Sequence, residues 1–368
     1  MSVLPEPVLQ ILDNQTGLTV FQYDKMAPGK IFHDVVVVKA RFKLLAGGLC
    51  PVPKPGILVL ADESRQPDDP LGSSLAQAGD LILGKPGADI LVTGMAYPGR
   101  PAQRFHVGLR ISHNQLPLVN YGCTATGERH WQYSRTQSWH MSEPVEAEQV
   151  PIAYELAWGG RRPEPDVPPE AWDIYRPNPS GSGYSFAGYS VDEQPSAPQW
   201  EPEVSQIQTP PLLTGFGPVA RHWQSRQQYT GTYDEEWRKQ LEDNPPYLDY
   251  PADFDLHFFQ CAHPSLQSRA PLVGNECLEL MHLVKGVPYL KTWLPCIGIQ
   301  AYWQEGLARQ QATLPLDTVR ICTDEETDGN SIDLTWRWSK PQYLNIRWLS
   351  LRVAQLPEPE ENIARGEI

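Results

Sequence analysis

The stretch "HDVVVVKARFKLL" (residues 33–45) decides the fold, because it is the clearest β-strand in the sequence. Its four consecutive valines are β-branched and favour extended backbone. An alternating pattern follows, which puts Val38, Ala40, Phe42 and Leu44 on one face and Lys39, Arg41 and Lys43 on the other. We expect the apolar face to pack into a core and the basic face to lie in water.

Short apolar stretches interrupted by glycine and proline continue this pattern and predict further strands. They are "ADILVTGMAYP" (88–98), "RFHVGLRI" (104–111), "LPLVNYG" (116–122), "GERHWQY" (127–133), "FDLHFFQCA" (254–262) and "NECLELMHLV" (275–284). "DTVRICTD" (317–324) and "SIDLTWRW" (331–338) predict a hairpin. The best helix is "TYDEEWRKQLEDNPP" (232–246), with Thr232 or Asp234 as its cap and Trp237 seated in the core.

The chain has 37 prolines and 12 tryptophans among its 368 residues. Proline limits helix and favours short strands with long connections. Segments such as "RRPEPDVPPEAWDIYRPNPSGSGY" (161–184) have almost no periodicity, so we expect ordered loops pinned by aromatic residues. The predicted fold is mainly β, an antiparallel two-layer sandwich with long proline-rich loops and few short helices.

Near residue 150 the alternating strand pattern gives way to proline-rich sequence without periodicity. We therefore divide the chain into three segments of one continuous body. Residues 1–149 form an N-terminal antiparallel β unit, residues 150–340 a loop-rich β unit packed on it, and residues 341–368 a C-terminal strand or extension with an acidic, frayed tail. A two-layer arrangement follows because strands with one apolar face need a second apolar layer.

Composition narrows the function classes. A net charge of −14 repels nucleic-acid backbones, so nucleic acid is not expected as a partner. No stretch approaches the apolar length of a membrane helix, and the N-terminus lacks a secretory signal pattern, which predicts no membrane anchoring and a cytoplasmic location. The six scattered cysteines are expected to be free, mostly buried thiols.

Three catalytic or ligand-binding motifs fail on context. "GDLILGKPGAD" (79–89) has the spacing of a phosphate loop, but apolar residues fill it and Pro86 stands where a hydroxyl is needed, so we expect a turn with Lys85 in water. "PNPSGSGY" (177–184) is neither a nucleotide loop nor a serine elbow. Cys261, His263, Glu276, Cys277 and His282 show no metal-ligand spacing. We predict no catalytic, cofactor-binding or metal-binding residue.

Two carboxylates stand apart from the solvated acidic runs. Glu155 in "AYELAWGG" and Glu276 in "LVGNECLEL" lie among apolar neighbours and should be buried. Such an acid serves as a general acid or base, or it accepts backbone N–H bonds, which is the commoner arrangement.

The order of several motifs resembles a domain-of-unknown-function family encoded in type VI secretion clusters beside spike, PAAR and toxic effector genes. The first matches are "K-P-x-x-D", "Y-E-x-A-x-G-G" and "N-P-x-G-x-G" plus an aromatic; then come a glycine, "W-x-x-R", "G-T-Y-D-x-x-W" and "G-x-E". The matched residues are Lys85, Pro86, Asp89, Tyr154, Glu155, Ala157, Gly159, Gly160, Asn178, Pro179, Gly181, Gly183, Tyr184, Gly215, Trp223, Arg226, Gly231, Thr232, Tyr233, Asp234, Trp237, Gly274 and Glu276.

The resemblance extends to a late hairpin with Leu316–Thr318, Trp336 and Arg337, and so covers nearly the whole chain. The chain departs from the family pattern at Ser225, where proline is usual, and at "PQWEPE" (198–203). We expect the loops at these departures to face a partner that differs between members.

The resemblance implies a non-catalytic cytoplasmic adaptor or chaperone. It would bind a type VI secretion effector near its PAAR or N-terminal region and promote loading on the VgrG spike. Tryptophans on proline-stiffened loops suit such protein binding. Two alternatives remain at this point: a hydrolase that uses Glu155 or Glu276, and a structural spike-associated component.

Overall fold

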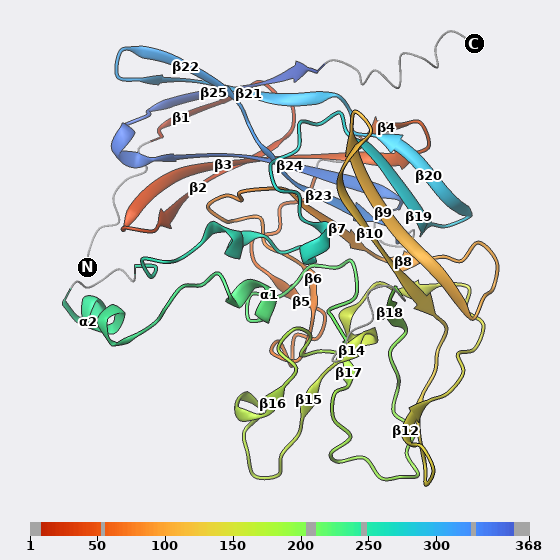
Figure 1. Cartoon of the computed structure of the whole chain (residues 1–368). Helices are drawn as coiled ribbons and strands as arrows, with labels where there is room; N and C mark the ends of the chain where they lie inside the picture. Colours follow the sequence, from red (N-terminus) through yellow and green to blue (C-terminus); the bar gives the residue numbers. More distant parts are fainter. Residues whose placement is uncertain (1–8, 53–55, 204–210, 244–248, 325–328, 357–368) are drawn as a thin grey trace, which may run out of the picture.

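The computed structural model describes residues 9–52, 56–203, 211–243, 249–324 and 329–356. The described structure is 46% strand and 7% helix, so the mainly β prediction is confirmed. Most strand pairs are antiparallel, but β1 with β25, β7 with β23, and β14 with β17 are parallel. Figure 1 shows the larger sheets in the upper part and long loops below.

The central sheet contains the stretch from which the fold was predicted. Its path is β2 (Thr19–Ala27), β3 (Ile31–Leu45), β24 (Ser331–Pro341), β23 (Leu316–Cys322) and β7 (Asp89–Thr93), with β4 (Gly48–Pro51) also paired to β3. The predicted hairpin of β23 and β24 is confirmed. Val38, Ala40, Phe42 and Leu44 of β3 all enter the main core, as their alternation predicts.

Two further sheets complete that core. One has the order β18 (Trp200–Pro202), β10 (Leu116–Thr126), β9 (Arg104–His113), β19 (Cys277–Val284) and β20 (Val287–Trp293); the other has β1 (Ile11–Asn14), β25 (Trp348–Gln355), β21 (Ile297–Glu305) and β22 (Ala308–Thr313). Leu109 of β9, Ala301 of β21 and Val38 of β3 belong to one hydrophobic cluster. This packing of sheets is consistent with a β-rich sandwich.

The boundaries after residues 149 and 340 do not separate sheets. Strand β3 pairs with β24, β9 with β19, and β1 with β25, so all three segments of the chain share hydrogen-bonded ladders. Strand β25 provides the C-terminal strand of the third segment. The acidic tail at 357–368 lies outside the described residues.

The remaining elements are short. Two-stranded ladders join β5 (Glu63–Ser64) to β6 (Leu75–Gln77), β8 (Met95–Ala96) to β13 (Val150–Pro151), β11 (Trp131–Ser134) to β12 (Ser138–Met141), β14 (Trp158–Gly159) to β17 (Ser182–Gly183), and β15 (Arg161–Arg162) to β16 (Asp173–Ile174). The helices are α1 (Gln224–Gln227), α2 (Glu235–Asp243) and 3₁₀ turns at Tyr154–Leu156, Pro169–Ala171, Leu256–Phe259, Pro264–Leu266 and Gln342–Leu344.

The strand predicted at 254–262 is wrong, since Leu256–Phe259 form a 3₁₀ turn. Asp255 caps this turn by accepting a hydrogen bond from the amide of His257. Its aromatic residues still reach the interior, because Phe259 packs with Val35 and Leu83 in a small second core. The apolar content of the stretch was informative, but its local capping chemistry outweighed its strand propensity.

Candidate functional site

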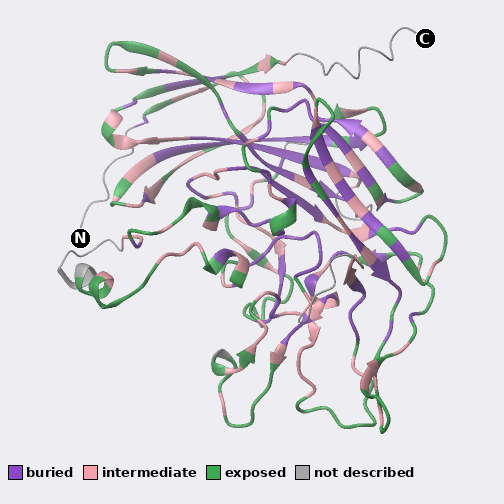
Figure 2. Ribbon diagram, in the orientation of Figure 1, coloured by how far each residue is buried: buried purple, intermediate pink, exposed green. Residues whose placement is uncertain are grey.

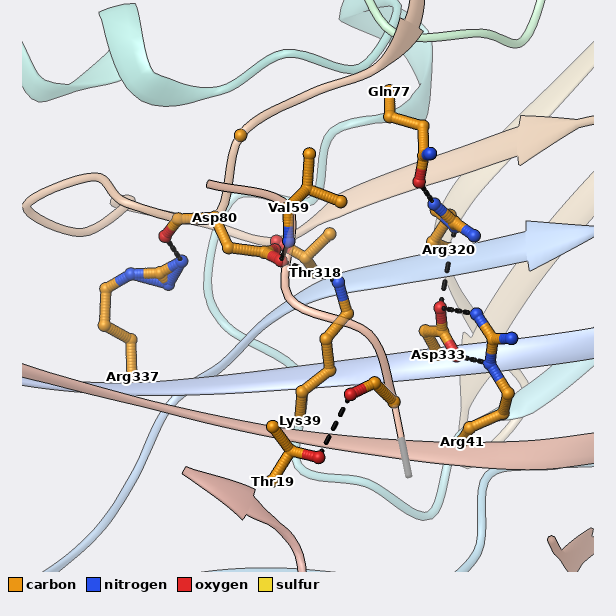
Figure 3. A network of polar contacts seen from close by, with 12 residues as sticks. Thr19, Lys39, Arg41, Val59, Gln77, Asp80, Thr318, Arg320, Asp333 and Arg337 are labelled. Carbon is orange, nitrogen blue, oxygen red and sulfur yellow. Dashed lines mark hydrogen bonds and ion pairs between the residues drawn. The ribbon is translucent and has the colours of Figure 1, made fainter. Parts of the chain in front are cut away.

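Two of the three basic residues on this face of β3 are buried, which corrects the expectation that the face lies in water; only Lys43 is exposed. Lys39 is 3% exposed and Arg41 is 7% exposed. The ammonium group of Lys39 lies 2.7 Å from the Asp80 carboxylate. Arg41 holds Asp333 of β24 through two hydrogen bonds of 2.6 and 2.8 Å. Figure 3 shows the segment that carries Val59, Gln77 and Asp80 crossing over this face of the sheet.

The same layer of ion pairs extends toward β7. Arg337 donates to Asp317 at 2.9 Å, and Lys85 lies 2.7 Å from Asp89. The prediction of a solvated Lys85 is therefore wrong. Burial alone would lower the pKa of the Lys85 ammonium, but Asp89 and, with smaller contributions, Cys261 and Asp317 together raise it. The carboxylate of Asp89 also accepts a hydrogen bond from the amide of Cys261, and Pro86 lies half-buried beside it.

This layer has almost no free space. The cavity lined by Lys39, Asp80, Thr318 and Arg320 measures about 20 Å³, which is room for one water molecule. A buried ion pair is costly to form, and removing one partner leaves an uncompensated charge in the interior. The layer therefore joins the sheet to its covering segment and offers no place for a substrate.

Several motif residues converge around the buried ring of Tyr154. The Tyr154 hydroxyl donates to the carbonyl of Gly217 at 3.0 Å, and its ring meets Trp223 edge-on at 5.3 Å. A Cβ on Gly215 would lie 2.7 Å from the Tyr154 ring, so only glycine fits there. Arg226 donates to the carbonyls of Val219 and Phe258. These contacts hold the segment 215–226 against Tyr154 and Phe258.

Asn178 links the "Y-E-x-A-x-G-G" and "N-P-x-G-x-G" motifs. Its side-chain amide donates to the carbonyls of Tyr154 at 2.9 Å and Trp158 at 3.0 Å. Its own carbonyl accepts from the amide of Gly160 at 2.9 Å. Strand β14 pairs in parallel with β17 beside this residue. A side chain on Gly159 or Gly181 would overlap neighbouring backbone there. Asn178 and Pro179 are both buried. We call this set of backbone contacts around Asn178 the Asn178 junction.

Gly183 is the point where two aromatic clusters meet. Its φ is +100°, and a Cβ there would lie 2.6 Å from the Trp131 ring and 3.1 Å from the Trp158 ring. On one side, Phe186 stacks on Trp139 at 4.7 Å and meets Trp131 edge-on. The other cluster joins Trp158, Tyr175 and Tyr184.

We call residues 127–148 and 157–199 the loop lobe; Figure 2 shows its strands and loops mainly in the intermediate and exposed colours. Seven of the twelve tryptophans are buried, while Trp139, Trp158 and Trp172 of the loop lobe are half-buried. Tyr133 and Met141 are exposed on β11 and β12. The lobe thus presents apolar side chains on loops that hydrogen bonds hold in place.

Both singled-out carboxylates are occupied by protein donors. Glu276 is 1% exposed and accepts from the amides of Val273 at 2.6 Å and Gly274 at 2.8 Å. Glu155 is half-buried and accepts from the amide and the hydroxyl of Ser74. Each carboxylate serves as an acceptor that fixes a turn, which is the commoner of the two roles expected for it.

The "G-T-Y-D-x-x-W" motif lies apart from these groups. Asp253 accepts from the amide and hydroxyl of Thr232, and Asp234 caps α2 by accepting from the amide of Trp237. The expected helix is confirmed, but Trp237 is not a core residue. Its ring packs on Tyr233 and its indole donates to the Asp249 carbonyl. A Cβ on Gly231 would lie 2.6 Å from Asp253, which explains that glycine.

The thiols and histidines do not form a metal centre in the described part of the chain, where no cluster of three or more suitable side chains occurs. The six cysteines are thiols outside any disulfide, five of them buried, as predicted. His263 is buried, donates to the Leu213 carbonyl and accepts from the amide of Ser265. Burial lowers the pKa of His263 to about 4. Over the described ranges, no helix has both the length and the apolar character needed to cross a bilayer.

A family model described as an uncharacterized protein conserved in bacteria (DUF2169) matches residues 32–337. The chain belongs to this family. Its matched region begins just inside β3 and ends in β24, so it contains the ion-pair layer, the Tyr154 group and the loop lobe. No curated protein and no solved structure matches this DUF2169 chain.

Sequence patterns missed two features of this DUF2169 protein. The pairing of Lys39 and Arg41 with acids far along the chain leaves no local signal. The partly exposed cluster of Tyr133, Trp139 and Phe186 combines a hairpin with a distant loop, and the sequence showed only its aromatic content.

Proposed function

We propose that this protein is a non-catalytic adaptor that binds a type VI secretion effector through its loop lobe and promotes loading of that effector on the secretion spike. The observation that carries the proposal is the partly exposed aromatic cluster of Tyr133, Trp139 and Phe186. Aromatic residues dominate the energy of many protein interfaces because they bury a large area with few rotatable bonds.

Rigidity supports this role. The Asn178 junction and the left-handed Gly183 hold the lobe through backbone contacts, so little conformational entropy would be lost on binding. The order of motifs, which resembles effector adaptors, supports the class of partner. The chain's net charge of −14 favours an effector segment with basic residues beside its apolar anchors.

A second surface supports a variable partner. A hollow of about 470 Å³ lies between the loop lobe and the body, lined by Pro177, Leu212 and His263 among others. Ser225 and Pro202 also line it. These residues belong to the two places where the sequence departs from the family pattern, and the hollow brings them together.

The test is affinity capture of the tagged full chain from the bacterium that encodes it, with identification by mass spectrometry. We expect a PAAR-containing protein or an effector encoded beside it, recovered from the cell fraction. Recovery of neither would contradict the proposal. Appearance of the chain in culture medium together with the spike would favour the structural spike component instead.

Point variants locate the contact. Trp139→Ala and Phe186→Ala should reduce recovery of the effector, whereas Tyr343→Ala, an exposed aromatic outside the lobe, should not. Equal recovery with all three variants would place the contact elsewhere.

A further inference from the structure

The outer face of the five-stranded sheet carries a separate hollow of about 250 Å³. Its floor lies where Gly108 of β9 and Gly122 of β10 stand directly opposite each other. Glycine inside a strand weakens the strand and often marks a place where another group approaches closely. The His106 ring lies over both glycines, so a side chain at either position would crowd it.

Charged side chains surround this floor without tight pairing. Nδ1 of His106 lies 3.5 Å from the Glu203 carboxylate, and the Arg110 guanidinium lies 3.7 Å from Glu279. Charge-assisted hydrogen bonds are usually about 2.7–2.9 Å long. Glu279 also accepts a hydrogen bond from the Tyr289 hydroxyl. The side chains of His106, Arg110 and Glu203 remain substantially exposed, so a ligand can reach them.

The opposite charges stand on two sides of the glycine floor. The Glu203 carboxylate lies over Gly122, since a Cβ there would be 2.6 Å from its oxygen and equally close to the His106 ring. Arg110 pairs with Asn120 two residues further along the same two strands. Neighbouring strands are about 4.8 Å apart, which separates the backbones of Glu203 and Arg110 by roughly 12 Å and leaves a small ligand between their side-chain ends.

We propose that this hollow binds a small zwitterion of the size of a free α-amino acid. The ligand's ammonium group pairs with Glu203, and its carboxylate accepts hydrogen bonds from Arg110 and Asn120. The volume lies just below the usual range for drug-sized ligands, about 300–1,000 Å³. A purely anionic ligand would be repelled by Glu203, by Glu279 and by the overall negative charge, and a purely cationic one would offer no acceptor to the Arg110 guanidinium. This site is independent of the proposed adaptor function.

The test uses isothermal titration of the full chain with L-glutamine and L-leucine. Each is compared with its N-acetyl derivative, which lacks the ammonium group, and its α-amide, which lacks the carboxylate. We expect at least one free amino acid to bind, with each single-charge analogue weaker by about tenfold, the scale of one charged hydrogen bond. The amide resonances of Gly108 and Gly122 should shift on binding.

Variants connect the binding to the named groups. Arg110→Gln and Glu203→Gln should each weaken binding by about tenfold, and both change partly exposed side chains without altering the fold. Gly122→Ala should abolish binding, because its Cβ would lie 2.6 Å from both Glu203 and the His106 ring and would displace them. Arg104→Gln, a partly exposed arginine earlier in β9, and Gly48→Ala, where a Cβ meets nothing within 4 Å, are the matched controls.

Three results would overturn the proposal. The first is absence of binding up to the solubility limit of both amino acids. The second is binding of the single-charge analogues as tightly as the zwitterion. The third is unchanged binding by both Arg110→Gln and Glu203→Gln.

Discussion

The polar face of the six-stranded sheet and the loop lobe differ in which kind of side chain is buried. Under the covering segment, Lys39, Arg41 and Arg337 are buried and paired with carboxylates. In the lobe, Trp139 and Phe186 stay partly exposed although they are apolar. The charged residues thus hold the fold together, while these aromatic residues stay partly accessible to solvent. Residue type alone would assign these roles the other way round.

The comparison teaches that the lobe's exposure is built in rather than a packing failure. The positive φ of Gly183 and the hydrogen bond from the Asn178 amide to the Tyr154 carbonyl hold the loops in place. The aromatic rings on these loops remain partly accessible. The ion-pair layer, by contrast, closes to a cavity of about 20 Å³. Substitutions in the ion-pair layer should mainly change stability, and substitutions in the loop lobe should mainly change binding.

The largest effect is expected from Asp333→Asn. This change removes the carboxylate that receives two hydrogen bonds from Arg41 and leaves a buried guanidinium without its counter-charge. The free energy of unfolding should fall by about 3–5 kcal/mol, measured by urea denaturation. Glu143→Gln breaks the exposed pair with Arg104 and should cost no more than about 1 kcal/mol. Similar losses in the two variants would mean that the layer is not energetically buried.

A pH effect of nearly that size is expected at the junction of body and lobe. The pKa of His263 is about 4 in the folded protein, against an ordinary value of 6.5. Between these values the unfolded chain binds a proton that the folded protein does not. Stability should therefore decrease as the pH falls from about 6.5 to 4, by up to about 3 kcal/mol from this group.

The control is His263→Gln, which should remove that dependence. Burial raises the pKa of Asp34 to about 6, so that carboxyl changes stability in the opposite direction over an overlapping range. The difference between the parent and His263→Gln isolates the histidine. A difference that stays constant between pH 4 and 6.5 would contradict the assignment.

A smaller loss of stability is expected from Gly183→Val. The new side chain would meet both the Trp131 and the Trp158 rings at a backbone conformation that suits glycine. We expect about 1–3 kcal/mol of destabilisation by thermal unfolding, together with loss of effector binding, because both aromatic clusters shift. The neighbouring Ser182→Ala should stay within about 0.5 kcal/mol and keep binding. Loss of function by a folded Ser182→Ala would revive an enzymatic interpretation.

The sequence predicted several of the longer strands, such as β3, β9 and β10, because their signals are local, but it missed β2 and β21. The alternation of Val38, Ala40, Phe42 and Leu44 sets one face of β3 wherever that strand lies. It could not predict the fate of Lys39 and Arg41, because Asp80 and Asp333 come from segments 41 and 292 residues away. A basic alternating face is solvated or paired depending on what covers it, and only the tertiary fold decides that.

The site was predictable in part for the same reason. Glycines such as Gly181 and Gly183 in the proline-rich loop are consistent with the close backbone approach and the positive φ found there. Which aromatic residues stay exposed was not visible, since Trp200 is buried and Trp139 is half-buried in similar local contexts. The facing glycines Gly108 and Gly122 were a signal within predicted strands, but their register becomes known only with the structure.

The smallest effect on stability is expected from Trp139→Ala and Phe186→Ala, which test whether the loop lobe is the binding surface. Each variant is purified, its unfolding transition recorded, and its capture of the identified effector compared with that of the parent and Tyr343→Ala. The account predicts stability within about 1 kcal/mol of the parent and capture reduced at least about tenfold. Folded variants that capture the effector as well as the parent would contradict it.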